Sequence, residues 1–247
     1  MRLIIIGGGC YGCYHTRQLL KAQRRGAIAA DALVVVDRNP ACRALTEFAG
    51  EPLVRVVRAD WASFLYDELG ECSPETDDRL VPAPFAPHLL CDWLLAVARK
   101  AAPERTVERV ACALALGLPF ERGDGATGNR FISAAGWVCP ATCIETALCP
   151  AIRGPRTWEL GDLVRAGAAR APMPYQHVAL FTCRHFAFGI GTIPVAEMAR
   201  ARLELTRALR EDGSPQRALV GTISSCHGVL GELVAHAPSR NSAIIGA

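Results

Sequence analysis

Cysteines in the middle of the chain have a spacing that can bind a metal. Cys139, Cys143 and Cys149 follow the pattern C-x3-C-x5-C in a segment rich in glycine and proline, and proline follows the first and the last of them. Irregular backbone adapts to thiolate ligation, and a Cys-Pro pair is typical of ferredoxin-type iron–sulfur loops. The spacing differs from the ferredoxin runs and from the paired C-x2-C pattern of zinc sites.

We therefore expect an iron–sulfur cluster or a zinc ion on Cys139, Cys143 and Cys149, with a fourth ligand from a distant part of the chain. Four other cysteines are candidates for this ligand, and we choose Cys183 among Cys10, Cys112, Cys183 and Cys226. The alternative is that these thiols bind no metal, because free cysteine is often buried as a small apolar residue.

Two pairs of cysteine and histidine lie where predicted strands end. Cys183-x-His185 ends one expected strand, and Cys226-His227 follows another. Ligands of open α/β sheets bind beyond the carboxyl ends of the strands, and histidine and cysteine supply acid–base and nucleophilic groups. We therefore predict that His227, Cys226 and His185 are catalytic. The alternatives are a mixed Cys/His metal site and purely structural side chains.

A glycine pattern near the start of the chain has the spacing of a phosphate-binding turn. Gly7-x-Gly9-x-x-Gly12 lies between a short apolar run and a helical pattern, and Asp37 ends the next apolar run. In such a loop the first glycine permits a tight turn, the second lets a pyrophosphate approach, and the third lets helix and strand pack closely. The N-terminus of the helix then offers N–H groups to the phosphates.

An acidic residue at the position of Asp37 accepts hydrogen bonds from ribose hydroxyls and repels a 2′-phosphate, although the neighbouring Arg38 softens this preference. We therefore expect NAD, and NADP less so. A flavin or another nucleotide also fits the triple glycine before Cys10, and the alternative to all of these is an empty site. Cys10 and Cys13 are either thiols with a redox role at a helix N-terminus or small residues in tight packing. The predicted cofactor-binding residues are Gly7, Gly9, Cys10, Gly12, Asp37 and Arg38.

On these residues the chain resembles the Rossmann dinucleotide-binding superfamily, in the style of the NAD-binding domains of potassium-uptake regulators and of precorrin-2 dehydrogenases. The resemblance covers residues 2–37 and, weakly, later strands to about residue 115. It implies a parallel sheet with the dinucleotide at the glycine loop.

The order of the elements predicts the framework that positions these residues. Apolar runs at 2–6, 33–36, 53–57 and 79–81 alternate with helical patterns at 14–25, 41–49, 61–69 and 89–100. Alternating strands and helices with short links indicate a parallel α/β sheet. Further along the chain we expect strands at 177–183 and 218–223 and helices at 195–210 and 229–235, while 107–116 is ambiguous between strand and helix.

The expected fold is therefore α/β, with a Rossmann-like parallel sheet, a Cys-rich loop region and a smaller α/β C-terminal part. The expected boundaries are 1–120 for the dinucleotide-binding domain, 121–176 for the Cys-, Gly- and Pro-rich loop or cap, and 177–247 for the last part, which either stands alone or extends the same sheet.

Composition excludes several classes of protein. The chain of 247 residues is 51% hydrophobic with a net charge of +3, which argues against disorder. Its arginines are scattered and it has two lysines, so we expect no nucleic-acid partner. No apolar run approaches the roughly 18 residues of a membrane span, and the run after Met1 is too short for a signal peptide. With eleven cysteines, an odd number, we expect a cytoplasmic protein with reduced thiols.

These features lead to one main hypothesis and two alternatives. The main hypothesis is an NAD(H)-dependent oxidoreductase or electron-transfer protein with a cysteine-ligated iron–sulfur or zinc centre. Because hydride transfer moves two electrons and a cluster moves one, this hypothesis calls for a flavin or a redox partner protein. The first alternative is a non-catalytic module that senses NAD(H) or redox state. The second is a structural zinc protein that retains only the Rossmann frame.

Overall fold

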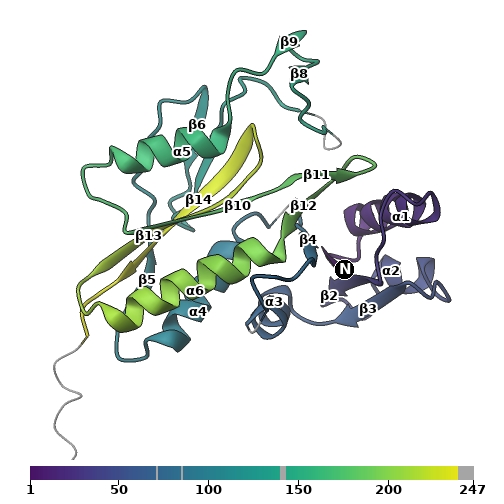
Figure 1. The fold of residues 1–247 in the computed structure, drawn as a ribbon, viewed down its shortest axis with the longest axis horizontal. Helices are drawn as coiled ribbons and strands as arrows, with labels where there is room; N and C mark the ends of the chain where they lie inside the picture. Colours follow the sequence, from purple (N-terminus) through teal and green to yellow (C-terminus); the bar gives the residue numbers. More distant parts are fainter. Residues whose placement is uncertain (71, 85, 140–142, 239–247) are drawn as a thin grey trace, which may run out of the picture.

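The chain folds into a mixed α/β structure with two six-stranded sheets and a short two-stranded one (Figure 1). The computed structural model describes residues 1–70, 72–84, 86–139 and 143–238. The helices are α1 (Cys10–Arg24), α2 (Arg43–Glu47), α3 (Trp61–Leu69), α4 (Leu89–Ala101), α5 (Leu160–Ala169) and α6 (Val195–Glu211). Within this part of the chain, none of the helices has the length and hydropathy that a bilayer span needs.

The first sheet has the order β11-β12-β4-β1-β2-β3. Its strands are β1 (Arg2–Ile6), β2 (Ala32–Asp37), β3 (Val54–Arg58), β4 (Arg79–Val81), β11 (Arg184–Ala187) and β12 (Ile190–Pro194). The four strands β3, β2, β1 and β4 are parallel, whereas β12 runs antiparallel to β4 and β11 antiparallel to β12.

Helices cover both faces of this sheet, which explains why its strands are continuous apolar runs. Leu3 and Ile5 of β1 lie in a buried cluster with residues of α1 and α2. Ile4 and Ile6 point to the other face and belong to a cluster with residues of α3, α4 and α6. The alternation of side chains along a strand thus sends one half of β1 into each core.

The second sheet has the order β10-β13-β14-β7-β6, and β5 also pairs with β14. Its strands are β5 (Val107–Val110), β6 (Phe120–Gly123), β7 (Arg130–Ser133), β10 (His177–Thr182), β13 (Gln216–Ile223) and β14 (His227–Ala235). Helix α5 packs on one face with Leu160 and Val164. Residues of α4 and α6 pack on the opposite face, toward the first sheet. The two-stranded sheet of β8 (Leu148–Cys149) and β9 (Gly154–Pro155) lies beyond α5 (Figure 1).

The two large sheets share one core. A single buried cluster contains Ile4 and Val34 of the first sheet together with Val220 and Leu233 of the second. The chain also passes directly from β10 in the second sheet through Cys183 into β11 in the first. The pocket described below, on the second sheet, therefore lies on the same packed body as the glycine loop.

The structure differs from the expected elements at the C-terminal end. Residues 229–235 were expected to form a helix but belong to strand β14, which pairs with β13 over eight positions from Ile223↔Gly228 to Gln216↔Ala235. The helix prediction was wrong because both faces of β14 are largely buried, so the strand is a short apolar run that periodicity cannot distinguish from a helix.

Sheet membership does not follow the expected boundaries. Strand β5 falls before residue 120 but belongs to the second sheet, and β11 and β12 fall after residue 177 but belong to the first. The segment 121–176 contains strands β7, β8 and β9 and helix α5, although its pattern predicted irregular structure. Strand pairing over long sequence separations produced these differences, and local periodicity carries no information about it.

Candidate functional site

The loop after β1 has a backbone shape that depends on glycine. Gly7 has a φ of +95°, a conformation that residues with a Cβ rarely adopt. A Cβ on Gly12 would lie 1.6 Å from the carbonyl oxygen of Gly7, so α1 approaches this turn too closely for any side chain. Gly9 is the N-cap of α1, no side chain caps this helix end, and a Cβ on Gly9 would meet nothing within 4 Å. The loop therefore has no room for a side chain at Gly12 and has open space at Gly9.

Asp37 at the end of β2 fixes this loop. Its carboxylate accepts hydrogen bonds from the backbone N–H of Gly8 at 2.6 Å and from that of Asn39 at 2.8 Å. Trp61 closes the other side, because its indole N–H donates to the carbonyl of Val36 at 3.1 Å and its ring lies 3.6 Å from the Cβ position of Gly7. Asp37 thus reaches the glycine loop from the neighbouring strand.

The remaining residues predicted to bind the cofactor border this loop. Cys10 is the first residue of α1 and is exposed, as is Arg38 beside Asp37. Cys13 is fully buried, and burial raises the pKa of its thiol to about 11. Cys13 is therefore not an activated redox thiolate, and its environment agrees with the packing alternative.

A second feature is a pocket of about 740 Å³ at the edge of the second sheet. Its walls come from the loop after β4, the β6–β7 hairpin, the segments 135–139 and 143–145, and the start of β14. Pro84, Phe120, Phe131 and Trp137 contribute apolar surface. Ser133, Glu145 and His227 contribute polar groups to the same space. The pocket thus combines a large apolar wall with a few polar side chains, as small-molecule sites do.

His227 has one ring nitrogen fixed and the other free. The hydroxyl of Ser133 donates to the carbonyl of Ala135 at 2.7 Å and accepts from its N–H at 2.9 Å. Because the only proton of this hydroxyl is used, the 2.9 Å contact between Ser133 and His227 has Nδ1–H of His227 as the donor. The buried Nε2 has no hydrogen-bond partner and carries the lone pair. Burial lowers the pKa of His227, so the neutral ring is available as a base.

Glu145 connects the cysteine-containing segment to the turn before β14. One carboxylate oxygen accepts from the hydroxyl of Ser224 at 2.5 Å, and the other accepts from the N–H of Ser225 at 2.7 Å. Glu145 itself has a φ of +51°, a strained conformation for a residue with a side chain. The same Ser224 hydroxyl accepts from the N–H of His227 at 3.2 Å. Glu145 therefore positions the backbone that presents His227.

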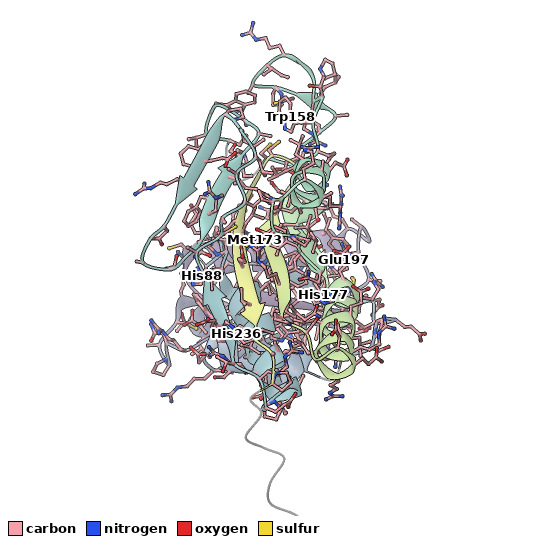
Figure 2. All side chains as sticks on the ribbon, turned by 90° about the vertical axis from the view of Figure 1, so that its left-hand side faces the viewer. His88, Trp158, Met173, His177, Glu197 and His236 are labelled. Carbon is pink, nitrogen blue, oxygen red and sulfur yellow. The ribbon has the colours of Figure 1, made fainter. Side chains whose placement is uncertain are left out.

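Cys226 lies next to His227 but is buried behind the pocket. It is 5% exposed, and the indole N–H of Trp158 donates to its Sγ at 3.4 Å. Figure 2 shows Trp158 at the opposite end of the second sheet from His236, which follows the last residue of β14. Burial raises the pKa of the Cys226 thiol, so it is protonated near neutral pH. This environment favours packing rather than the nucleophilic role predicted for Cys226.

The cysteines predicted as metal ligands are not brought together. Cys139 and Cys143 both line the pocket, but Cys149 is buried in β8. Cys183 lies at the junction of the two sheets, where burial raises its pKa to about 12. Across the described ranges, no group of three or more His, Cys, Asp or Glu side chains is arranged to hold a metal ion. The cluster or zinc ion on these four cysteines stays a prediction.

His185 lies on the hairpin of β11 and β12, away from the residues that line the pocket. Its side chain is exposed, and Nε2 accepts a hydrogen bond from the N–H of Gly189 at 3.2 Å. The prediction that His185 is catalytic thus has no support from its surroundings. Of the three residues predicted to be catalytic, His227 alone lines the pocket.

Sequence reasoning missed several residues of the pocket. Ser133 and Glu145 are distant from His227 in sequence and meet it through the pairing of β7 with β14 and through the fold of the cysteine-containing segment. No motif links them. The nearest signal was the high density of chemically active residues in 133–149, which was interpreted as a metal-binding loop.

The chain belongs to the family described as "Uncharacterized protein, C-terminal domain", whose model matches residues 90–236, more than half of the chain. The match runs from α4 to the end of β14 and includes every pocket segment except the loop that contains Pro84. The glycine loop lies outside it. No curated protein and no solved structure matches the chain.

Proposed function

We propose that the chain is an NAD(H)-dependent oxidoreductase, with the dinucleotide bound beyond the carboxyl ends of β1 and β4 and the substrate bound beside His227. The observation that carries this proposal is the parallel order β3-β2-β1-β4 with a glycine turn between β1 and α1. This is the strand order of one half of a Rossmann fold. It agrees with the resemblance that the glycine motif indicates.

The arrangement of the helices supports the location of the dinucleotide. Helices α1 and α2 cover one face of the sheet, and α3 and α4 cover the other. The point where the connections change sides therefore lies between β1 and β4. Open α/β sheets bind ligands in the crevice beyond the strand ends at this point. The open position at Gly9 leaves room for a pyrophosphate at the N-terminus of α1.

The residue that ends β2 supports NAD rather than NADP. Asp37 already accepts two backbone N–H groups, and a carboxylate has lone pairs left for ribose hydroxyls. Its negative charge repels a 2′-phosphate. Arg38 is exposed next to it, so the preference should be moderate rather than absolute.

One residue of the pocket lies in a loop at the strand ends of the first sheet. Pro84, which lines the pocket, belongs to the loop that follows the carboxyl end of β4. A substrate in the pocket would thus lie on the β4 side of a dinucleotide held at the glycine loop. We therefore assign the pocket and the glycine loop to one reaction.

His227 would act as the general base and general acid of this reaction. When bound, NAD⁺ accepts a hydride from a carbon that carries a hydroxyl group. The lone pair on Nε2 of His227 takes the hydroxyl proton as the carbonyl forms, and the protonated ring returns it in the reverse direction. Ser133 keeps Nδ1–H in place, which leaves Nε2 as the basic nitrogen of the ring.

Calorimetric titration with NAD⁺ and NADP⁺ tests the proposal. We expect NAD⁺ to bind more tightly than NADP⁺, and Asp37→Ala to lose most of this difference. Asp31→Ala is the control, because Asp31 is an exposed carboxylate that pairs with the N-terminal amine. Thermal unfolding of each variant checks the fold. Absence of dinucleotide binding to the wild type would refute the proposal, whereas binding without reduction of NAD⁺ by any alcohol would favour a non-catalytic sensing module.

A further inference from the structure

We infer that the pocket beside His227 takes an uncharged alcohol or its carbonyl product with an apolar, ring-sized body. The inference names the substrate class of the proposed oxidoreductase and rests on that function for its chemistry. Its evidence is independent, because it comes from the walls of the pocket alone.

The walls are mainly aromatic and proline side chains. Phe120, Phe131 and Trp137 line the pocket together with Pro84 and Pro119. Aromatic side chains bury large areas and favour flat apolar partners. A pocket of about 740 Å³ is large enough for a drug-sized molecule. The body of the ligand is therefore expected to be apolar and to be held by contact with these rings.

The charges on the walls exclude an anionic substrate. No lysine or arginine is among the described residues that line the pocket, and the one ionisable carboxylate is Glu145. A phosphate or carboxylate would be buried without a cation and close to a negative charge, which is costly in a poorly solvated site. Arg156 contacts Glu145 from outside the lining, but its guanidinium donates to the Glu145 carbonyl at 2.6 Å and to Glu159 at 2.5 Å.

The same arrangement argues against a cationic substrate. Both carboxylate oxygens of Glu145 already accept hydrogen bonds, from Ser224 and from Ser225. These bonds commit Glu145 to the turn before β14, so that an ammonium group in the pocket would find only the lone pairs that they leave. His227 lines the pocket, and burial lowers its pKa, so that the neutral ring adds no positive charge and suits an uncharged ligand. The polar end of the pocket is thus matched to one neutral hydroxyl or carbonyl group.

Three probes with one ring and different charges test this inference. Cyclohexylmethanol, cyclohexanecarboxylate and cyclohexylmethylammonium are titrated into the full chain by calorimetry without any dinucleotide. We expect cyclohexylmethanol to bind roughly tenfold or more tightly than either ion, since the carboxylate finds no cation and the ammonium finds only a carboxylate that is already bound to Ser224 and Ser225. Equal or tighter binding of the carboxylate or of the ammonium would overturn the inference, and so would absence of binding by all three.

A variant with an added cation makes the test specific to this pocket. Val138 lines the pocket but is 96% exposed and is not one of the rings that hold the ligand, so Val138→Arg places a guanidinium at the rim with little cost to the fold. We expect it to improve binding of cyclohexanecarboxylate several-fold and to leave cyclohexylmethanol within about threefold. Leu203→Arg is the matched control, because Leu203 is 43% exposed on α6, away from this pocket. An equal gain in both variants would contradict binding in the pocket.

The experiment separates failure of this inference from failure of the proposed function. Binding of cyclohexylmethanol to a protein that does not bind NAD⁺ would refute the dinucleotide proposal and keep the chemistry of the pocket. Tight NAD⁺ binding with a preference for the carboxylate probe would refute the substrate class and keep the dinucleotide site.

Discussion

The turn between β1 and α1 and the turn between β13 and β14 both follow the carboxyl end of a strand, but different forces shape them. Backbone sterics determine the first, because Gly7 takes a positive φ and a side chain at Gly12 would collide with the Gly7 carbonyl. Side chains from distant segments determine the second, where Glu145 binds Ser224 and Ser225. The shape of the first turn depends on glycines within six residues, with Asp37 and Trp61 packed against it, whereas the second depends mainly on side chains from the tertiary fold.

This difference also separates the two proposed roles. A turn made of backbone leaves N–H groups and open space, which suits a phosphate group. A turn braced by side chains holds His227 in one orientation, with Nδ1 directed to Ser133 and Nε2 free. Our proposal thus places binding and proton transfer at turns of different construction, and substitutions at each should have different consequences.

The largest effect is expected in the turn between β1 and α1. Gly12→Ala would place a methyl group 1.6 Å from the Gly7 carbonyl oxygen, so α1 must move away from β1. We expect a loss of about 3 kcal/mol or more in the free energy of unfolding, at the upper end of overpacking costs. Urea denaturation measures this loss. Gly9→Ala is the control and should cost no more than about 1 kcal/mol, because its Cβ position is open. Equal stability of the two variants would contradict the close approach of α1.

An intermediate effect is expected in the turn between β13 and β14, which the side chain of Glu145 supports. Glu145→Ala removes two hydrogen bonds and leaves the hydroxyl of Ser224 and the N–H of Ser225 without their acceptor. We expect a loss of about 2 kcal/mol in the free energy of unfolding, together with weaker binding of the pocket probe. Glu159→Ala is the control. The Glu159 carboxylate is partly exposed and pairs with Arg156, so the loss in the free energy of unfolding should stay below about 1 kcal/mol. Identical losses in the two variants would show that Glu145 does not brace the turn.

A smaller effect is expected in the pH dependence of stability. Burial lowers the pKa of His227, while the negative charge of Glu145 raises it by a smaller amount. His227 therefore binds a proton more readily in the unfolded chain than in the folded one. Its contribution to the free energy of unfolding is complete above the ordinary histidine pKa of 6.5 and declines as the pH falls below this value. His227→Gln should flatten the stability curve below this pH, as measured by urea denaturation at several pH values. A curve of unchanged slope would place His227 in a solvated environment.

The same contrast explains what the sequence could predict. The glycine spacing predicted the turn after β1, since the steric effect of each glycine is local, and Asp37 was found because it ends the next apolar run. The segment 229–235 was predicted as a helix but is a strand. Because both faces of this strand are buried, its apolar residues show no alternation that would distinguish it from a helix. The partners of His227 were missed because Ser133 and Glu145 reach it only through strand pairing and the fold of the cysteine-containing segment. The metal site on the clustered cysteines stays a prediction, since spacing alone does not show whether side chains converge.

The most direct test of the central proposal is the affinity of Gly9→Ala for NAD⁺. This substitution leaves the fold almost unstrained, yet it places a methyl group where a pyrophosphate would meet the N-terminus of α1. Gly213→Ala is the matched control, because a Cβ there also meets nothing within 4 Å and the residue lies after α6. We predict that Gly9→Ala weakens NAD⁺ binding at least about tenfold, corresponding to about 1.4 kcal/mol, while Gly213→Ala binds like the wild type. Unchanged affinity in Gly9→Ala would show that the dinucleotide does not bind at this loop.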